Sequence, residues 1–211
     1  MAEERSARTK EEVIKDFRTT EIVRAARRVI AESGFDDASM EQIAHEAGVA
    51  KGTLYLYFRN KEELLAHVAE HGFEELMERA RLATSRARGV APKLVGLLRA
   101  ALEHTGENRE VFRTLQERTR LGLPGESPLA AKLEHNRQQL LRFVAAIVER
   151  GAKSGELRGC DSRRAARFLI ESMRGAVIDR LQSQSPTGVE RDAEAIVDFF
   201  LHGVGATEKR K

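Results

Sequence analysis

The chain has 211 residues, of which 41% are hydrophobic and 33% charged, so a folded globular protein is favoured over a disordered one. Cys160 is the only cysteine, which excludes a disulfide framework and a cysteine-rich metal site and is typical of a reducing cytoplasm. No apolar run approaches the roughly 18 residues that span a bilayer, and Met1–Lys10 lacks the apolar segment of a signal peptide. We therefore expect a cytoplasmic protein without a membrane anchor.

The charge permits binding to nucleic acid without requiring it. The formal net charge is +3 and the isoelectric point is near 9.2. Residues 1–65, however, hold 11 Lys and Arg against 13 Asp and Glu. If this segment binds DNA, its positive charge must be gathered locally rather than spread over the whole segment.

The first 60 residues predict three helices separated by short turns. Apolar residues recur at helical spacing before Gly34, which ends the first helix: they are Ile22, Val23, Ala26, Val29 and Ile30. Ser39 and Gln42 form a capping box that opens a short second helix, and Gly48 ends it. A third helix is predicted over 50–58.

The rest of the chain is also predicted to be helical. Asn60 with Glu63 indicates a second capping box and a fourth helix. Glycines, prolines and polar runs then separate five further helices, which we expect over 91–106, 109–121, 128–153, 162–183 and 189–203. The predicted fold class is therefore all-α.

Three short helices with a glycine at the second turn are typical of a helix-turn-helix. Leu54 and Phe58 are four residues apart, so they share the face of the third helix that packs inward. The other side of this helix is small at its start and carries hydroxyls and cations suited to phosphates. Ser39 and Lys61 stand at the starts of the second and fourth helices, where backbone N–H groups also attract phosphate, so both are candidate phosphate contacts.

Residues 22–65 resemble the TetR family of bacterial transcription regulators. The resemblance is strongest at Ala25-Ala26, Gly34-Phe35, Ile43-Ala44, Ala47-Gly48-Val49, Lys51-Gly52-Thr53-Leu54-Tyr55, Phe58 and Lys61-Glu62-Glu63-Leu64. It implies an N-terminal arm over 1–17, a helix-turn-helix DNA-binding domain over 18–63, and a C-terminal bundle of about six helices over 64–211. In this family the bundle dimerises and often binds a small effector.

The resemblance also assigns DNA contacts by position. The recognition helix corresponds to Lys51, Gly52, Thr53, Tyr55, Leu56 and Tyr57, and Ser39 and Lys61 correspond to phosphate contacts. Position 57 is often His in the family and is Tyr here. Position 56 is usually polar or aromatic, and Leu56 is instead suited to a thymine methyl group. The arm residues Arg5, Arg8 and Lys10 have two interpretations: they contact the minor groove, or they belong to a disordered tail.

Two further groups of residues have alternative interpretations. His67 and His71 have the spacing of metal ligands, but no third ligand is evident, so we expect an ordinary helical pair, no metal and no cofactor. A ligand pocket or a plain core is formed by five residues of the bundle: His104, Phe112, Gln116, Phe143 and Met173.

The last two predicted helices carry broad apolar stripes, and in the TetR family such helices pair across a two-fold axis. The predicted dimer interface comprises Phe168, Leu169, Met173, Ala176, Val177, Ile196, Phe199 and Phe200. A two-fold dimer would present its recognition helices to inverted half-sites about 34–36 Å apart, or a multiple of that distance.

The leading hypothesis is a ligand-responsive repressor that binds double-stranded operator DNA as a homodimer. The alternative is a DNA-binding protein of the same fold that answers to a protein partner or to no effector. An enzyme is disfavoured because the chain lacks a phosphate loop, a nucleophile elbow and an evident pair of catalytic carboxylates.

Overall fold

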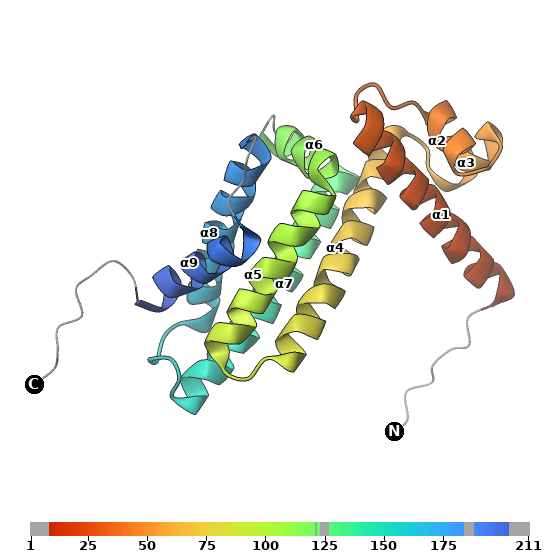
Figure 1. The fold of residues 1–211 in the computed structure, drawn as a ribbon. Coiled ribbons are helices and arrows are strands. Elements are labelled where there is room, and N and C mark those ends of the chain that lie inside the picture. The colour runs from red at the N-terminus through yellow and green to blue at the C-terminus, as the bar shows by residue number, and fades with distance from the viewer. Residues whose placement is uncertain (1–8, 121, 123–126, 184–187, 203–211) are drawn as a thin grey trace, which may run out of the picture.

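The computed structural model describes residues 9–120, 122, 127–183 and 188–202, which form nine helices and no strand (Figure 1). The helices are α1 (Lys10–Ser33), α2 (Met40–Glu46), α3 (Lys51–Tyr57), α4 (Lys61–Arg86), α5 (Val90–Glu107), α6 (Arg109–Arg120), α7 (Pro128–Ser154), α8 (Ser162–Gln182) and α9 (Val189–His202). The all-α fold class is confirmed, and the observed helix ends lie within one or two residues of those predicted from α3 onward. None of the helices described is long and apolar enough to cross a membrane.

Local capping sets where the first helices begin. The Ser39 hydroxyl accepts from the Gln42 N–H, and the Gln42 side chain accepts from the Ser39 N–H, which confirms the predicted capping box of α2. The second predicted box is only half formed. Asn60 accepts from the Glu63 N–H at 2.8 Å, but the Glu63 carboxylate accepts from the N–H of Arg59 instead.

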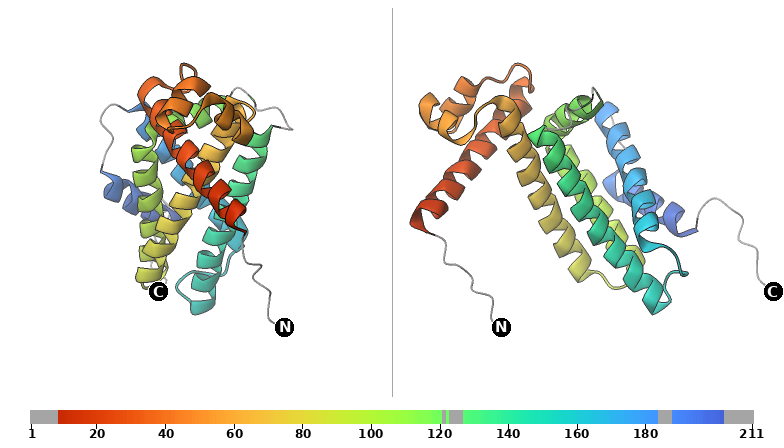
Figure 2. Two further views of the ribbon diagram at one scale, coloured as in Figure 1. Left: turned by 90° about the vertical axis from the view of Figure 1, so that its right-hand side faces the viewer. Right: turned by 180° about the vertical axis from the view of Figure 1, so that it is seen from behind.

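Helix α1 begins earlier than predicted, because Thr9 and Glu12 form a capping box that the sequence analysis missed. The predicted arm over 1–17 is therefore wrong for residues 10–17, which are helical, and Lys10 opens the helix. Arg5 and Arg8 lie outside the described residues. The first turns of α1 project away from the bundle (Figure 2), and Phe17 is 61% exposed there.

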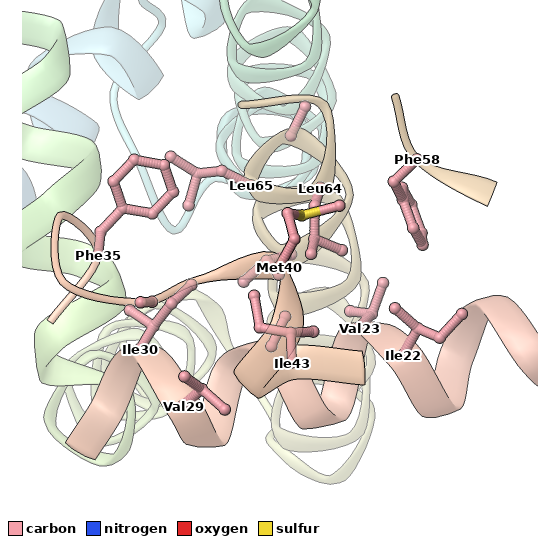
Figure 3. Close-up of a cluster of buried hydrophobic side chains, with 14 of the residues drawn as sticks. Ile22, Val23, Val29, Ile30, Phe35, Met40, Ile43, Phe58, Leu64 and Leu65 are labelled. Atoms are coloured by element: carbon pink, nitrogen blue, oxygen red, sulfur yellow. The ribbon is translucent and has the colours of Figure 1, made fainter. Parts of the chain in front are cut away.

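The N-terminal core joins α1, α2 and α3 to the start of α4 (Figure 3). Its largest fully buried side chains include Ile22, Ile30, Ile43, Leu54, Phe58, Leu64 and Leu65. Val111 of α6 and Leu129 of α7 complete it from the other side. Helix α4 is continuous across the predicted boundary between residues 63 and 64. A displacement of α4 therefore also displaces the residues at its start that belong to the N-terminal core.

A second core fills the bundle formed by α4, α5, α7, α8 and α9. Helix α5 lies between α4 and α9, with α7 behind it (Figure 1). Helix α6 crosses the end of this bundle and packs against α1. One end of the bundle is therefore in direct contact with the helix-turn-helix.

Candidate functional site

Helix α3 has one buried face and one face open to solvent. Leu54 and Phe58 are 0% and 1% exposed, whereas Leu56 on the opposite side is 84% exposed and Tyr55 is 43% exposed. The turn before α3 needs Gly48, because its φ of +65° lies in the left-handed region that other residues rarely adopt. A firmly anchored short helix is thus presented outward after a tight turn, which is the geometry of a recognition helix.

The six predicted recognition residues do not all face solvent equally. Lys51, Gly52, Tyr55 and Leu56 are exposed, and no neighbouring heavy atom lies within 4 Å of where a Cβ on Gly52 would stand. Thr53 and Tyr57 are half-buried, and the Tyr57 side chain packs against the N-terminal core.

Lys51 pairs with Glu41 of α2, and the hydrogen bond between the two side chains raises the pKa of Lys51 and lowers the pKa of Glu41. Both side chains are more than half exposed, so a phosphate can compete with Glu41 for the ammonium. Ser39 accepts from Gln42 at 3.1 Å through its oxygen, which leaves the hydroxyl proton available to a phosphate.

Lys61 has a different role from the phosphate contact that the sequence predicted. Its ammonium donates to the backbone carbonyls of Phe35, Asp36 and Ala38, at 2.7, 2.9 and 2.8 Å. An ammonium has three N–H donors, so none remains for a phosphate in this arrangement. Lys61 instead holds the loop between α1 and α2 in place. We therefore assign it a structural role rather than the predicted phosphate contact.

The same loop is also held from the bundle side by Arg118 of α6, a residue that the sequence analysis missed. Its guanidinium pairs with Asp36 and with Glu62, both at 2.9 Å, and lies over the Phe35 ring at 4.7 Å. Residues 36 and 118 are far apart in sequence, so only the packing of α6 against the helix-turn-helix reveals this link.

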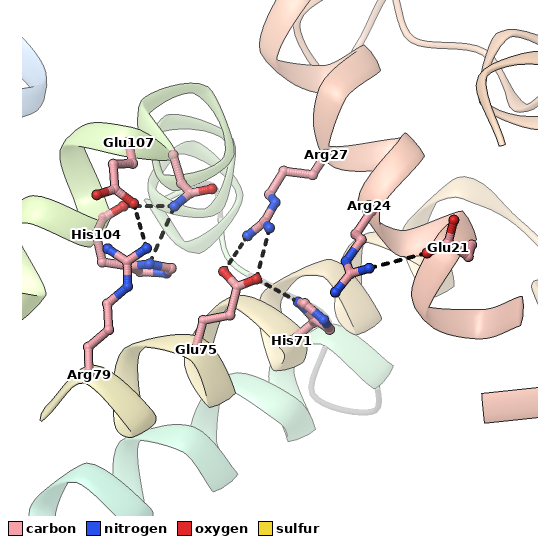
Figure 4. Close-up of polar contacts among 9 residues, drawn as sticks. Glu21, Arg24, Arg27, His71, Glu75, Arg79, His104 and Glu107 are labelled. Carbon is pink, nitrogen blue, oxygen red and sulfur yellow. Dashed lines mark hydrogen bonds and ion pairs between the residues drawn. The ribbon is translucent and has the colours of Figure 1, made fainter. Parts of the chain in front are cut away.

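A second link joins α1 to α4 (Figure 4). Arg27 donates to both carboxylate oxygens of Glu75, at 2.6 and 2.9 Å, and the Nδ1 atom of His71 lies 3.3 Å from the same carboxylate. The hydrogen bonds from Arg27 hold the pKa of Glu75 below its usual value. Arg79 and Glu107 form a neighbouring pair at 2.7 Å.

An inner cavity of about 120 Å³ lies where the helix-turn-helix meets the bundle. Its wall is mostly apolar and is made by Arg27, Val68, Ala69, Gly72, Phe73, Leu76, His104, Asn108, Val111, Phe112, Leu115, Leu133 and Asn136. Two of the five predicted pocket residues, His104 and Phe112, therefore line this cavity. Gln116, Phe143 and Met173 do not line this cavity, and the last two pack against the C-terminal core.

A second, more polar hollow of about 370 Å³ lies between α4 and α7 and shares Phe73 and Asn136 with the inner cavity. Its wall carries the carboxylates of Glu70, Glu74 and Glu78. Phe73 and Asn136 therefore stand between an acidic surface hollow and the apolar interior.

The two histidines with metal-ligand spacing point to separate partners. His67 packs edge-on against Phe58 with 5.2 Å between ring centroids, and His71 lies beside Glu75. Within the described residues, no group of three or more metal-ligating side chains is present.

The predicted dimer residues on α8 and α9 fall into three groups. Leu169 is 1% exposed inside the C-terminal core, so its assignment to a subunit interface is wrong. Phe168 and Phe199 are 61% and 54% exposed. The remaining five are half-buried against the C-terminal core: Met173, Ala176, Val177, Ile196 and Phe200.

Fold and site together define a helix-turn-helix DNA-binding protein with a cavity-bearing helical domain. Residues 22–68 match the family model described as bacterial regulatory proteins, tetR family. Over 185 residues the chain is 24% identical to the uncharacterized HTH-type transcriptional regulator YhgD of Bacillus subtilis (strain 168), covering 88% of this chain and 95% of the relative. Residues 22–68 thus form a DNA-binding domain of the tetR family, and the chain is a DNA-binding transcription regulator.

Solved structures of similar fold include two that are described with a bound ligand. The transcriptional regulator FadR from Bacillus subtilis in complex with stearoyl-CoA has a TM-score of 0.75 and 23% identity, with 88% of this chain and 99% of that chain covered. AibR in complex with isovaleryl coenzyme A and operator DNA has a TM-score of 0.63 and 23% identity, with 87% and 98% covered.

Proposed function

We propose that this regulator is a homodimeric repressor that binds an inverted-repeat operator through α3 and releases it when a small effector fills the inner cavity. The observation that carries the proposal is the place of Arg27. This residue belongs to α1 of the helix-turn-helix and also lines the cavity, where it pairs with Glu75 of α4. A ligand in the cavity therefore acts directly on the junction between α1 and α4.

The thermodynamic requirement is a difference in ligand affinity between two arrangements of α1 and α4. An effector that binds more tightly to the arrangement unable to grip DNA lowers operator affinity by the same factor as DNA lowers effector affinity. A change from 99% competent to 1% competent needs about a 10⁴-fold difference in affinity. Arg118 provides a second connection, because α6 lines the cavity and holds the loop before α2.

On the DNA side, we assign readout and positioning to different residues. Leu56, exposed and apolar, is placed to contact a thymine methyl group, while Tyr55, Lys51 and the Ser39 hydroxyl are placed to contact phosphates. Phosphate contacts fix the register of α3 on the duplex, and Leu56 contributes to base preference.

For the dimer, we propose an interface centred on Phe168 of α8 and Phe199 of α9. Both side chains are more than half exposed, and they belong to two helices that pack against each other. A two-fold pairing of α8 and α9 would cover both and would set the distance between the two copies of α3.

For the effector, we propose an acyl compound, of which acyl-CoA thioesters are the first candidates. FadR and AibR are described in complex with stearoyl-CoA and with isovaleryl coenzyme A. The cavity here, at about 120 Å³, is close to the roughly 150 Å³ cavity that holds benzene in an engineered protein. Its size favours a short branched chain over an 18-carbon chain.

The experiment that tests this function has two stages. Bound duplexes are first selected from a random DNA pool at a stated salt concentration near physiological. Operator affinity is then measured with and without isovaleryl-CoA and stearoyl-CoA, using free coenzyme A as the matched control. We expect an enriched inverted repeat, and weaker binding with isovaleryl-CoA but not with coenzyme A.

The outcomes separate the parts of the proposal. Failure to enrich any repeat with folded protein contradicts sequence-specific binding. An enriched repeat whose affinity responds to neither thioester contradicts the acyl-CoA class and favours the alternative regulator that answers to a protein partner or to no effector.

A further inference from the structure

One polar group in the inner cavity has no partner. His104 of α5 is 1% exposed, and its Nε2 atom makes no hydrogen bond within the described structure. Its ring contacts Phe112 of α6 edge-on, with 5.8 Å between the ring centroids. Buried polar atoms are nearly always hydrogen-bonded, so an exception inside a cavity points to a missing partner.

The proton on this ring can be placed from its neighbour Asn108. The Nδ2 atom of Asn108 donates to the carbonyl oxygen of His104 at 2.9 Å, which fixes the orientation of the amide. The same nitrogen lies 3.4 Å from the Nδ1 atom of His104. Since an amide nitrogen only donates, Nδ1 acts as the acceptor and the proton lies on Nε2. Burial lowers the pKa of His104, which keeps the ring neutral near pH 7.

The residue that lies opposite the Nε2–H group is a glycine. A Cβ added to Gly72 of α4 would stand 3.6 Å from Nε2, and both Gly72 and His104 line the cavity. A buried donor without a partner costs free energy, which a ligand oxygen in the cavity would recover. The wall around the donor is mostly apolar.

We propose that the inner cavity binds a compact apolar ligand of about six non-hydrogen atoms whose single carbonyl oxygen accepts a hydrogen bond from Nε2–H of His104. This rests on the proposed effector response and makes it more specific: His104 favours ligands with one acceptor over pure hydrocarbons of the same shape. The size follows from the benzene-sized volume, and the chemistry follows from the unpartnered nitrogen of His104.

The test uses two uncharged probes of nearly equal shape, cyclopentanone and methylenecyclopentane, which differ in a C=O group against a C=CH₂ group. Uncharged probes avoid the carboxylates of the neighbouring hollow. Binding is followed in the full-length protein by NMR, through the ring ¹⁵N signals of His104. We expect Nε2 to carry the proton, its signal to shift on titration, and cyclopentanone to bind about five-fold more tightly, as one net hydrogen bond implies.

Three variants sharpen the test. His104→Phe keeps an aromatic ring but removes the donor, so both probes should bind alike. Gly72→Ala places a methyl group against Nε2 and should weaken both probes at least ten-fold. Gly106→Ala is the matched control, because this glycine of α5 has open space around it and does not line the cavity.

Three results would overturn the proposal: a proton on Nδ1 in the wild-type protein, equal affinity for the two probes in the wild-type protein, or no saturable shift with either. The ring ¹⁵N signals of the wild-type protein are read whether or not a variant folds. The DNA selection and the thioester response are measured separately. The protein can therefore release DNA with acyl-CoA even if His104 binds neither probe, and it can bind the probes even if acyl-CoA has no effect on DNA binding.

Discussion

Replacing Lys61 with Met tests the role that the structure gives this side chain. The change keeps an apolar stem and removes the ammonium that donates to three carbonyl oxygens. Hydrogen bonds to a charged group contribute about 1.5–3 kcal/mol each. Water replaces the donor at the exposed Asp36 carbonyl, so we count only the part-buried carbonyls of Phe35 and Ala38 and take the lower value. The expected loss is about 3 kcal/mol.

The assay is denaturant and thermal unfolding at a fixed protein concentration, with Lys93→Met as the matched control on a lysine for which the described structure gives no ion pair. A loss of about 3 kcal/mol lowers the Tm by roughly 6–12 °C for a chain of this size. Operator affinity is then measured against salt below the Tm of the variant. The salt slope should not change, because Lys61 neutralises no phosphate.

The opposite result would refute the reasoning. An unchanged Tm, together with a salt slope reduced by about one unit, would mean that Lys61 contacts a phosphate after all.

Four other predictions concern separate parts of the molecule. Leu56→Ala should leave the free energy of unfolding within about 0.5 kcal/mol yet change which bases are enriched by selection; an identical enriched repeat would exclude Leu56 from readout. The pKa of Glu75 is depressed, so its pairing with Arg27 stabilises the fold above the unfolded pKa near 4.5, and this stabilisation is lost as pH falls through the folded pKa. Arg27→Met should reduce the free energy of unfolding at pH 7 and make it depend less on pH in the acid range. Urea titrations at several pH values will measure both effects. Gly72→Ala should raise stability by roughly 0.5–1 kcal/mol, as alanine does inside a helix, and a lower Tm would mean that the added methyl group clashes. Phe168→Asp should produce a folded monomer in sedimentation experiments, and an unchanged sedimentation coefficient would place the dimer interface elsewhere.

Much of the fold could be predicted because helices are determined by local patterns. Apolar spacing, capping residues such as Ser39, and breakers such as Gly34 act within a few residues of the helix that they set. The inward face of α3 follows from the same local rule, since Leu54 and Phe58 are four residues apart. The early start of α1 was missed even though its signal, the box of Thr9 and Glu12, is equally local.

The sequence by itself therefore determined the nine helices of the described residues, a helix-turn-helix, and four of the six predicted recognition residues as exposed. Only the tertiary structure decided what the polar side chains do, because their partners are distant in sequence. Lys61 donates to three loop carbonyls because the α1–α2 loop folds back over it. Arg27 lines the cavity because α1 packs against α4. Likewise, a broad apolar stripe cannot distinguish a core from an interface, and packing of α8 against its own subunit buried Leu169 while leaving Phe168 exposed.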